Sequence, residues 1–385
     1  MTVRRHGKRD GGWAILAGTM ALHVRGTVLP DGVERDVLVT DAGRFDLEGA
    51  SDAPTLLDGA FLIPGLVDAH CHLGLFSPAG EGASDDERAR ASAEMELGTG
   101  VLALREPGGP NHASTGLGPG VGLPRTFAAG RMLASPGGYV PGLGREVRAE
   151  DLPGACIEEL GAGGGTWAKV IGDWVDADGV FRPNFPPEAL AAAAVAVHAA
   201  GGRITAHVTL AATAEMVIDA GFDCIEHGDG ITDALVARLA DARIDWVPTL
   251  AIGVSVMPFV RALGATEAEM RRLTGSIEDL PRAVRLGSEA GVRILAGTDS
   301  GMLPHGRIAM EIASLAAAGL PTGAALAAGS WSGRAFLGLP GIEHGAPADL
   351  VAYARDPRED LSVLSEPLLI VLDGRVVGGT VAPRA

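Results

Sequence analysis

The chain has 385 residues, of which 47% are hydrophobic and 21% charged, enough for one large domain with a small one or for two medium domains. Its formal net charge of −17 argues against a nucleic-acid partner and against an anionic membrane surface, because both need a basic face. No apolar run approaches the length that spans a bilayer. We therefore expect a globular protein with a small-molecule partner.

The start of the chain imitates a signal peptide, because residues 1–10 are basic and residues 13–24 are fairly apolar. A strand-like pattern continues through His23 and Val28 without a small-residue cleavage site, so we expect a short disordered head on a cytoplasmic protein. Three scattered cysteines are too few for a disulfide framework. The sequence does not fix the oligomeric state, and a homo-oligomer is compatible with it because dimers are the commonest assembly.

Both ends of the chain are typical of short strands joined by tight turns. The expected strands near the start are 14–16, 20–25, 36–40, 44–47 and 55–57. Those near the end are 348–353, 368–372 and 375–377, with a hairpin turn at Asp373-Gly374. We expect residues 12–60 and 345–385 to form one small β-sandwich domain, and residues 61–344 to form a separate domain.

The middle of the chain alternates strands with helices. The expected strands are 61–70, 100–105, 125–131, 167–172, 203–208, 222–227, 245–250 and 292–298. The expected helices are 83–98, 150–161, 187–200, 210–220, 232–241, 266–290 and 307–318. This alternation predicts parallel pairing, and the length fits an α/β fold built on a (β/α)8 TIM-like barrel. An open doubly wound sheet is the alternative, but no phosphate-binding glycine loop follows the first strand.

Polar side chains gather at the predicted strand ends, where barrel enzymes carry their catalytic residues. Residues i and i+2 of a strand point to the same side, so His70 and His72 face one direction and make half of a metal site. They could also simply cap a strand near the surface. Four more polar residues stand at the ends of later strands: Lys169, His207, His227 and Asp299.

Lys169 is one of only two lysines among the 31 basic residues, and it lies within an apolar strand. A buried lysine is expensive, and arginine would serve a structural ion pair equally well. Lysine can lose its proton when it is buried near positive charge. The neutral amine can then react with carbon dioxide to give a carbamate, which resembles a carboxylate and can bridge two metals.

Together these residues resemble the amidohydrolase superfamily, and in particular its binuclear members near the prolidase and imidazolonepropionase branch. The resemblance covers nearly the whole chain. Its landmarks are Pro64 to His72, Lys169, His207, Glu226-His227-Gly228, Gly297 to Gly301, and Gly345 to Val351.

The resemblance implies a role for each ligand. His70 and His72 would bind one metal ion with Asp299, and His207 and His227 would bind a second. Lys169, as a carbamate, would bridge the two ions. Imidazole and carboxylate ligands suit zinc, with manganese, iron and cobalt as alternatives. The net positive charge of such a centre would suit an anionic or oxyanionic substrate.

The implied activity is hydrolysis of an amide C–N bond, in a dipeptide of the Xaa-Pro kind or in an N-acyl amino acid. A metal-bridging hydroxide would attack the carbonyl, and Asp299 would pass the proton to the leaving nitrogen. Alternatives are a cyclic amide hydrolase of the imidazolonepropionase kind, a phosphotriesterase-like activity and a catalytically inactive scaffold. An intact ligand set makes the scaffold the weakest of these.

Three further residues are candidates for substrate binding. Tyr139 follows the third strand, at a place where many relatives carry histidine, so it would contact a substrate oxygen or only pack. Arg105 ends the second strand and would contact substrate or form a structural ion pair. His305 follows Asp299 on the same loop and could line the pocket.

Residues 252–285 form the longest interruption of the alternating pattern. This insertion could cover the site, or it could be a helical hairpin added for packing. The aromatic content of 4% offers few stacking surfaces and gives little support to a large aromatic substrate.

Overall fold

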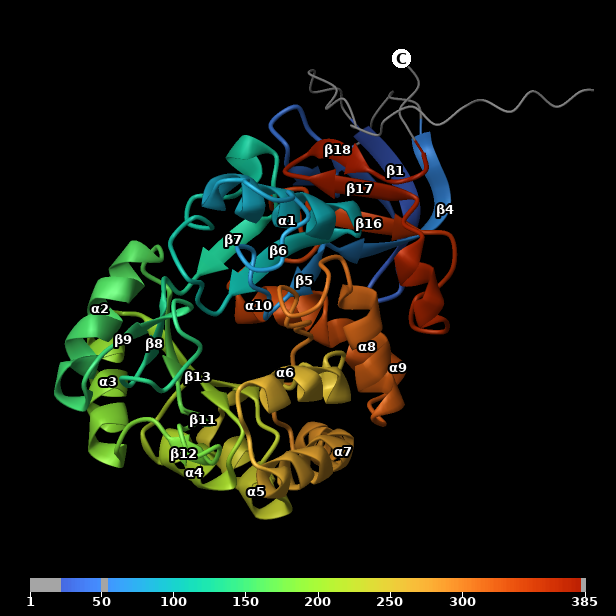
Figure 1. Ribbon diagram of the computed structural model, residues 1–385. Helices are drawn as coiled ribbons and strands as arrows, with labels where there is room; N and C mark the ends of the chain where they lie inside the picture. Colours follow the sequence, from blue (N-terminus) through green and yellow to red (C-terminus); the bar gives the residue numbers. More distant parts are fainter. Residues whose placement is uncertain (1–21, 50–54, 382–385) are drawn as a thin grey trace, which may run out of the picture.

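The computed structural model describes residues 22–49 and 55–381. The predicted basic head, the strand 14–16 and the first residues of the strand 20–25 lie outside the described residues. The two ends of the chain form one sheet, and the middle forms a ring of strands and helices beneath it (Figure 1). In the two described ranges, no helix is both long enough and apolar enough to cross a membrane.

The two chain ends meet in a seven-stranded sheet of order β18-β17-β16-β4-β1-β2-β3, so strands coloured blue and red lie side by side in Figure 1. The junction is antiparallel, with Ile63 of β4 opposite Val351 of β16. The sheet curls so that its two ends meet. At the contact, the N–H of Phe45 donates to the carbonyl of Ala346 over 2.9 Å. A separate apolar core lies between the two halves of the sheet, as expected for a sandwich. Its strands are β1 (Leu22–Val28), β2 (Val33–Val39), β3 (Phe45–Asp46), β4 (Thr55–Pro64), β16 (Leu350–Tyr353), β17 (Leu369–Leu372) and β18 (Arg375–Gly378).

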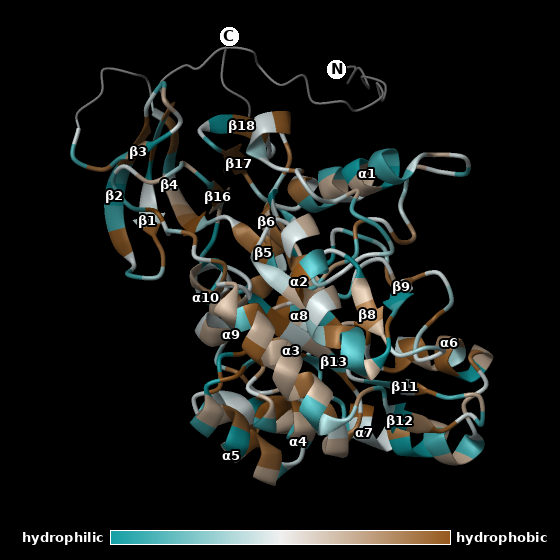
Figure 2. Cartoon of the chain, turned by 90° about the vertical axis from the view of Figure 1, so that its left-hand side faces the viewer, coloured by the Kyte–Doolittle hydropathy of each residue, from teal (hydrophilic) through white to brown (hydrophobic). Residues whose placement is uncertain are grey.

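The middle of the chain closes into the predicted TIM-like barrel through two parallel arcs, β5-β6-β7 and β8-β10-β13-β14-β15. Most side chains of these strands are buried, and β5 and β6 are largely brown, hence hydrophobic, in Figure 2. The barrel strands are β5 (Leu66–Asp68), β6 (Val101–Glu106), β7 (Arg125–Ala128), β8 (Met132–Ala134), β10 (Trp167–Ile171), β13 (Arg203–Val208), β14 (Cys224–His227) and β15 (Asp245–Val247). Three short strands lie outside the ring: β9 (Gly144–Glu146), β11 (Asp173–Val175) and β12 (Phe181–Pro183). The domain boundary at residues 60 and 61 stays a prediction; β4 itself runs on to Pro64.

Three of the eight predicted barrel strands differ from expectation. The strand predicted at 61–70 is divided, because its first residues belong to β4 of the terminal sheet and only β5 pairs within the barrel. The strand predicted at 125–131 ends early, at Ala128, and a separate strand, β8, begins at Met132; β7 pairs with β6 whereas β8 pairs with β10. The strand predicted at 292–298 is not a regular strand, since it bonds each neighbour at isolated positions. Leu295 N–H donates to Trp246 O (2.9 Å) and Ala69 N–H donates to Ala296 O (2.8 Å). These two bonds still close the ring between β15 and β5.

The seven predicted helices are all present, with bounds shifted by a few residues at most. They are α1 (Asp85–Gly98), α2 (Leu152–Ala162), α3 (Pro187–Ala199), α4 (Ala211–Asp219), α5 (Asp233–Ala242), α7 (Glu267–Glu289) and α8 (Ile308–Ala317). The sequence did not predict α6 (Met257–Ala262), α9 (Thr322–Ala328), α10 (Trp331–Phe336) or the short helices η1 (Pro119–Val121), η2 (Ala149–Asp151), η3 (Gly253–Val256) and η4 (Leu361–Ser365). The first barrel helix starts as its sequence indicates, with a capping box between Ser84 and Glu87.

Candidate functional site

Three side chains converge where β5 ends. The Nε2 atoms of His70 and His72 lie 3.2 Å apart, and each lies 3.4 Å from Oδ1 of Asp299. The buried Asp68 ties the two segments together, because its Oδ1 accepts the N–H of His70 (3.0 Å) and the N–H of Thr298 (3.1 Å). His70, His72 and Asp299 therefore form a candidate metal site.

The hydrogen bonds behind these rings fit a bound cation. His70 Nδ1 lies 2.7 Å from Oε2 of Glu226, and His72 Nδ1 lies 2.7 Å from the carbonyl oxygen of Gly108. Both partners can only accept, so each ring carries its proton on Nδ1 and turns a bare Nε2 toward Asp299. Three electron-pair donors in mutual contact repel one another unless a positive charge lies between them. This donor set is one that binds zinc and similar divalent ions.

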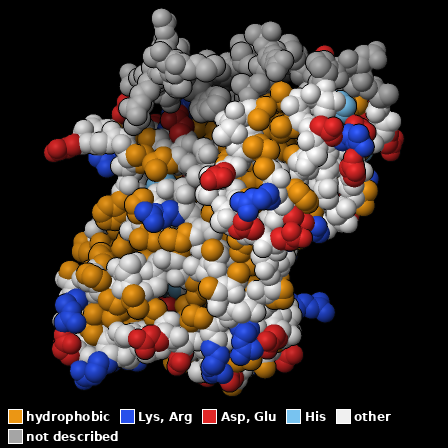
Figure 3. Space-filling model, turned by 90° about the vertical axis from the view of Figure 1, so that its right-hand side faces the viewer, with side chains coloured by type: hydrophobic (Ala, Val, Ile, Leu, Met, Phe, Trp, Pro, Cys, Tyr) orange, Lys and Arg blue, Asp and Glu red, His pale blue; other side chains and the backbone are white. Residues whose placement is uncertain are grey.

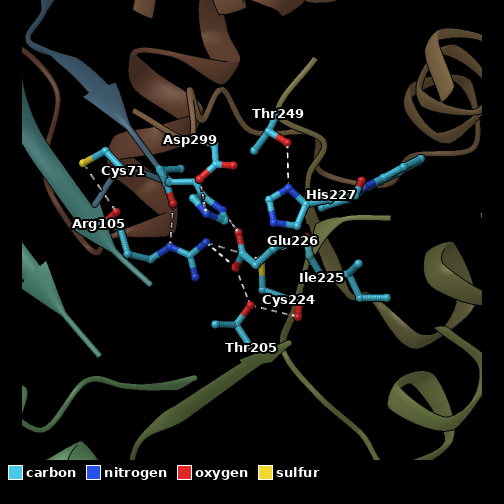
Figure 4. A network of polar contacts seen from close by, with 12 residues as sticks. Cys71, Arg105, Thr205, Cys224, Ile225, Glu226, His227, Thr249 and Asp299 are labelled. Carbon is cyan, nitrogen blue, oxygen red and sulfur yellow. Dashed lines mark hydrogen bonds and ion pairs between the residues drawn. The ribbon is translucent and has the colours of Figure 1, made fainter. Parts of the chain in front are cut away.

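Glu226 is the centre of the network under this site (Figure 4). Its Oε1 accepts from Nη2 of Arg105 over 2.5 Å and also from the hydroxyl of Thr205. Burial alone would raise the pKa of Glu226, but the charges of Arg105 and Lys169 and the hydrogen bond from His70 hold that pKa well below its usual range. Glu226 is thus a carboxylate fixed to hold the His70 ring in place.

The second pair of histidines stands on the neighbouring strands. His207 is the penultimate residue of β13 and His227 is the last residue of β14. Their ring centroids lie 4.5 Å apart, and the His227 ring lies 4.9 Å from that of His70. His227 Nδ1 lies 2.8 Å from the hydroxyl oxygen of Thr249. The Nε2 atom of His207 is buried without a hydrogen-bond partner among the described residues. Such a bare nitrogen needs a ligand, and a metal ion is one.

Lys169 lies within β10, two residues before its end, and its side chain faces the same cavity as the four histidines. Burial lowers the pKa of Lys169 to about 8, opposed by the nearby Glu226 carboxylate and supported by the Arg105 charge. A fraction of its amine is therefore neutral near pH 7.

Unusual backbone angles orient several side chains of the site. His227, Thr249 and Asp299 have φ angles of +62°, +49° and +53°, in a region that side-chain-bearing residues seldom enter. Strain of this kind persists where surrounding contacts fix the backbone, and it clusters at functional sites. Positive φ turns His227 out of the strand alternation, so that it faces the cavity although the preceding Glu226 also points into the barrel.

All six predicted metal ligands line a single cavity of about 440 Å³, which extends outward from the candidate metal site. Its walls are largely apolar, and Figure 3 shows hydrophobic side chains around a hollow in which histidine and carboxylate surfaces are visible. The insertion at 252–285 forms η3, α6 and α7 and contributes Ile252, Phe259 and Ile277 to these walls. This placement favours the covering role over a hairpin added only for packing.

Aromatic side chains gather in this cavity despite their scarcity in the chain. Tyr139, Trp174, Phe181 and Phe259 all line it, and the rings of Tyr139 and Trp174 lie 4.5 Å apart. The low aromatic content therefore does not argue against an aromatic substrate, because composition says nothing of where the rings lie. Tyr139 is at the cavity wall, as expected of a residue that contacts substrate or packs beside it.

Two predicted substrate contacts do not line the cavity. Arg105 is fully buried beneath it, donates from Nε to the carbonyl of Ala69 (2.7 Å) and stacks over Trp167 (4.6 Å). His305 is also buried, with Nδ1 3.0 Å from Oε1 of Glu96. Arg105 instead forms an ion pair with Glu226, which was the alternative to substrate contact, and His305 holds its own loop against α1.

Three residues that matter to the site were not singled out from the sequence. Glu226 was noted only beside His227, although an acid within the apolar strand Cys224–His227 is a signal comparable to Lys169. Thr249 gives no such signal, because its role depends on an unusual backbone angle. Asp229 stands two residues after His227 and lines the cavity.

Comparison with known proteins adds independent information. A family model described as the amidohydrolase family matches residues 149–377. An uncharacterised protein of Mycobacterium tuberculosis (strain ATCC 25618 / H37Rv) is 41% identical to this chain over 364 residues, which cover 93% of this chain and 96% of that protein.

Solved structures share the fold along nearly the whole chain. A Xaa-Pro dipeptidase with bound methionine in its active site has a TM-score of 0.78 at 22% identity, covering 93% of this chain and 99% of that one. The ochratoxinase of A. niger has a TM-score of 0.75 at 19% identity, covering 94% and 96%. Because the family model spans more than half of the chain, this protein belongs to the amidohydrolase family.

Proposed function

We propose that the protein is a metal-dependent hydrolase that cleaves an amide C–N bond of a small molecule. The observation that carries this proposal is the convergence of His70, His72 and Asp299. Nδ1 of each imidazole is hydrogen-bonded to an acceptor, which leaves Nε2 free to bind a metal ion. The family supports it, as does the fold shared with a Xaa-Pro dipeptidase and with a prolidase complexed with N-methylphosphonate-L-proline. Dipeptides and N-acyl amino acids are accordingly the first substrates to test.

The remaining ligands define a second metal position. His207 and His227 would hold the second ion, and Lys169 would bridge the pair once carbon dioxide adds to its neutral amine and a proton leaves. The unpartnered Nε2 atom of His207 supports this assignment. Nitrogen and oxygen donors favour zinc. Bound there, the ions would supply a Lewis acid and an activated water.

The chain's own groups complete the reaction. Asp299 takes a proton at its carboxylate as water adds to the carbonyl carbon, and returns that proton to the leaving nitrogen. The C–N bond breaks, so that the products are a carboxylic acid and an amine. The apolar cavity walls exclude bulk water and orient the substrate beside this carboxylate.

The metal content of the purified protein tests the site. Plasma mass spectrometry should find about two equivalents of metal, as in two-metal hydrolases. Lys169→Ala should reduce this content and should also remove a carbamate carbon signal from NMR spectra recorded in 13C-bicarbonate. His198→Ala, at an exposed histidine paired with Asp223, is the matched control. One equivalent that Lys169→Ala leaves unchanged would contradict the bridging role, and no metal at all would favour the inactive scaffold.

The chemistry is tested with the metal-loaded protein and a panel of amides. Mass spectrometry of the products should show release of an amine from at least one dipeptide, N-acyl amino acid or simple anilide, and loss of that release in the metal-free protein. Turnover confined to a cyclic amide would favour the imidazolonepropionase-like alternative over a linear amide.

A further inference from the structure

Basic and acidic side chains occupy different parts of the cavity. Its basic groups, the four histidines and Lys169, all belong to the candidate metal centre. Beyond that centre the ionisable side chains that line the described cavity are Asp229 and Glu278, apart from the phenol of Tyr139, and no arginine is among them. A free carboxylate on the substrate would therefore find no cationic side chain away from the metals.

Asp229 presents its carboxylate to this cavity. It follows β14 on the strand-end side of the barrel, two residues after His227, and it is half-buried. Within the described residues its side chain has no hydrogen bond and no ion pair. The neighbouring Asp173 behaves in the opposite way, because its carboxylate accepts the backbone N–H groups of Thr209 (3.0 Å) and Leu210 (3.0 Å). Asp173 is thus satisfied by the protein, whereas Asp229 is left for something that enters the cavity.

Arg272 on α7 does not pair with Asp229. Its Nε donates to Glu269 over 2.7 Å, no hydrogen bond or ion pair joins it to Asp229 among the described residues, and it does not line the cavity. A partly buried carboxylate without a partner is unfavourable, and a cation that pairs with it recovers that energy.

The rest of the cavity selects for an apolar body. Trp174, Phe181, Phe259 and Leu273 line it together with the aliphatic side chains of η3 and α7. A volume of about 440 Å³ lies within the range of pockets that enclose small molecules. The chemistry of the cavity is therefore hydrophobic walls, one free carboxylate and a hydrolytic centre at its base.

We propose that the substrate is an apolar amide that carries an ammonium group in place of a free carboxylate, and that Asp229 binds this ammonium. The proposal rests on the hydrolase function above. It departs from free-carboxylate dipeptides and N-acyl amino acids, and from the anionic substrate that the charge of the metal centre alone would favour. Asp229 thereby becomes the residue that sets specificity.

Binding is measured first, because it does not depend on turnover. The zinc-loaded protein is titrated by calorimetry with 4-phenylbutylamine, 4-phenylbutanol and 4-phenylbutyrate, which share a body and differ in one end group. We expect the amine to bind more tightly than the alcohol by roughly tenfold or more, the size of one charge-assisted hydrogen bond. Asp229→Asn should abolish that ratio, whereas Glu278→Gln at the exposed cavity rim should change it less than about twofold, because water screens its charge.

Several binding results would overturn the proposal. They are equal binding of amine and alcohol, a ratio that survives Asp229→Asn, and a ratio that depends on Glu278 instead. Anilides of 6-aminohexanoic, hexanoic and adipic acids then compare ammonium, methyl and carboxylate ends during hydrolysis, with release of aniline as the readout. Cleavage without preference for the ammonium would refute the role of Asp229 and leave the hydrolase intact. Amine binding that depends on Asp229, without cleavage of any amide, would refute the hydrolase function and leave the binding role of Asp229 intact.

Discussion

The Nδ1 atom of His70 lies 2.7 Å from Oε2 of Glu226, 156 residues further along the chain. The same carboxylate binds Arg105 and Thr205 with its other oxygen. One buried acid therefore fixes both the tautomer of a candidate metal ligand and the packing beneath it.

Glu226→Gln should weaken metal binding, and it should also destabilise the protein because Arg105 is left buried without its anionic partner. The amide keeps the size of the side chain but loses the charge that holds the His70 proton on Nδ1, and such changes behind a ligand lower metal affinity roughly 10- to 100-fold. Competition with a chromogenic chelator measures the zinc dissociation constant. Glu159→Gln is the control, because Glu159 is also buried and bound to Arg131 and Arg145, but on α2 away from the cavity. Equal loss of zinc affinity in both variants would contradict the assigned role.

Arg105→Met should destabilise the protein strongly. It leaves Glu226 buried without its cationic partner, and breaking a buried pair from one side costs about 3–5 kcal/mol. Urea unfolding of the metal-free protein measures the change in the free energy of unfolding. A variant of near-normal stability whose Michaelis constant alone rises would instead support the substrate contact considered from the sequence.

Glu311 anchors the loop that carries Thr249, since its carboxylate accepts the backbone N–H groups of Leu250 (3.1 Å) and Ala251 (2.6 Å). Burial raises the pKa of Glu311 from 4.5 to about 8, and these two hydrogen bonds only partly oppose the rise. The unfolded chain then releases this proton at lower pH than the folded protein does. The contribution of Glu311 to stability is therefore fully present below about pH 4.5 and is lost as the pH rises toward 8.

Glu311→Gln should consequently flatten the fall in melting temperature between pH 5 and pH 8. Calorimetric melting curves of the wild type and the variant across this range measure the effect. Glu159→Gln is again a useful control. Hydrogen bonds from Arg131, His112 and Arg145 lower the pKa of Glu159 to about 2 despite its burial, so this group does not titrate in that range. Parallel pH profiles in wild type and Glu311→Gln would refute the prediction.

Much of the fold could be predicted from the sequence, because the spacing of residues within a strand and the order of strands and helices are both visible in the sequence. The i, i+2 spacing of His70 and His72 placed both rings on one side of a strand, and the alternation of strands with helices indicated the barrel. The prediction of a regular strand at 292–298 was wrong. A backbone segment can close a barrel through a few isolated hydrogen bonds, and no local sequence pattern indicates this.

What the sequence could not supply is what depends on contacts between distant segments. Arg105 and His305 stand near strand ends like the ligands do, yet Glu226 and Glu96 draw them into the protein interior. The positive φ of Asp299, which aims its carboxylate at the two histidines, is likewise invisible to a residue pattern. Position along a barrel strand thus selected six candidate ligands that share one cavity, but it did not separate them from two residues that lie outside it.

Asp299→Asn should remove most turnover while metal remains bound. The amide oxygen can still serve as a ligand, but the side chain can no longer accept a proton, and loss of a general acid–base group lowers kcat roughly 10²- to 10⁴-fold. Steady-state kinetics on whichever amide the panel identifies give kcat, and plasma mass spectrometry on the same sample gives the metal content. His305→Gln, on the same loop but outside the cavity, controls for disturbance of the loop. Near-normal kcat in Asp299→Asn would remove Asp299 from proton transfer, whereas loss of metal in parallel with activity would reduce its role to that of a ligand.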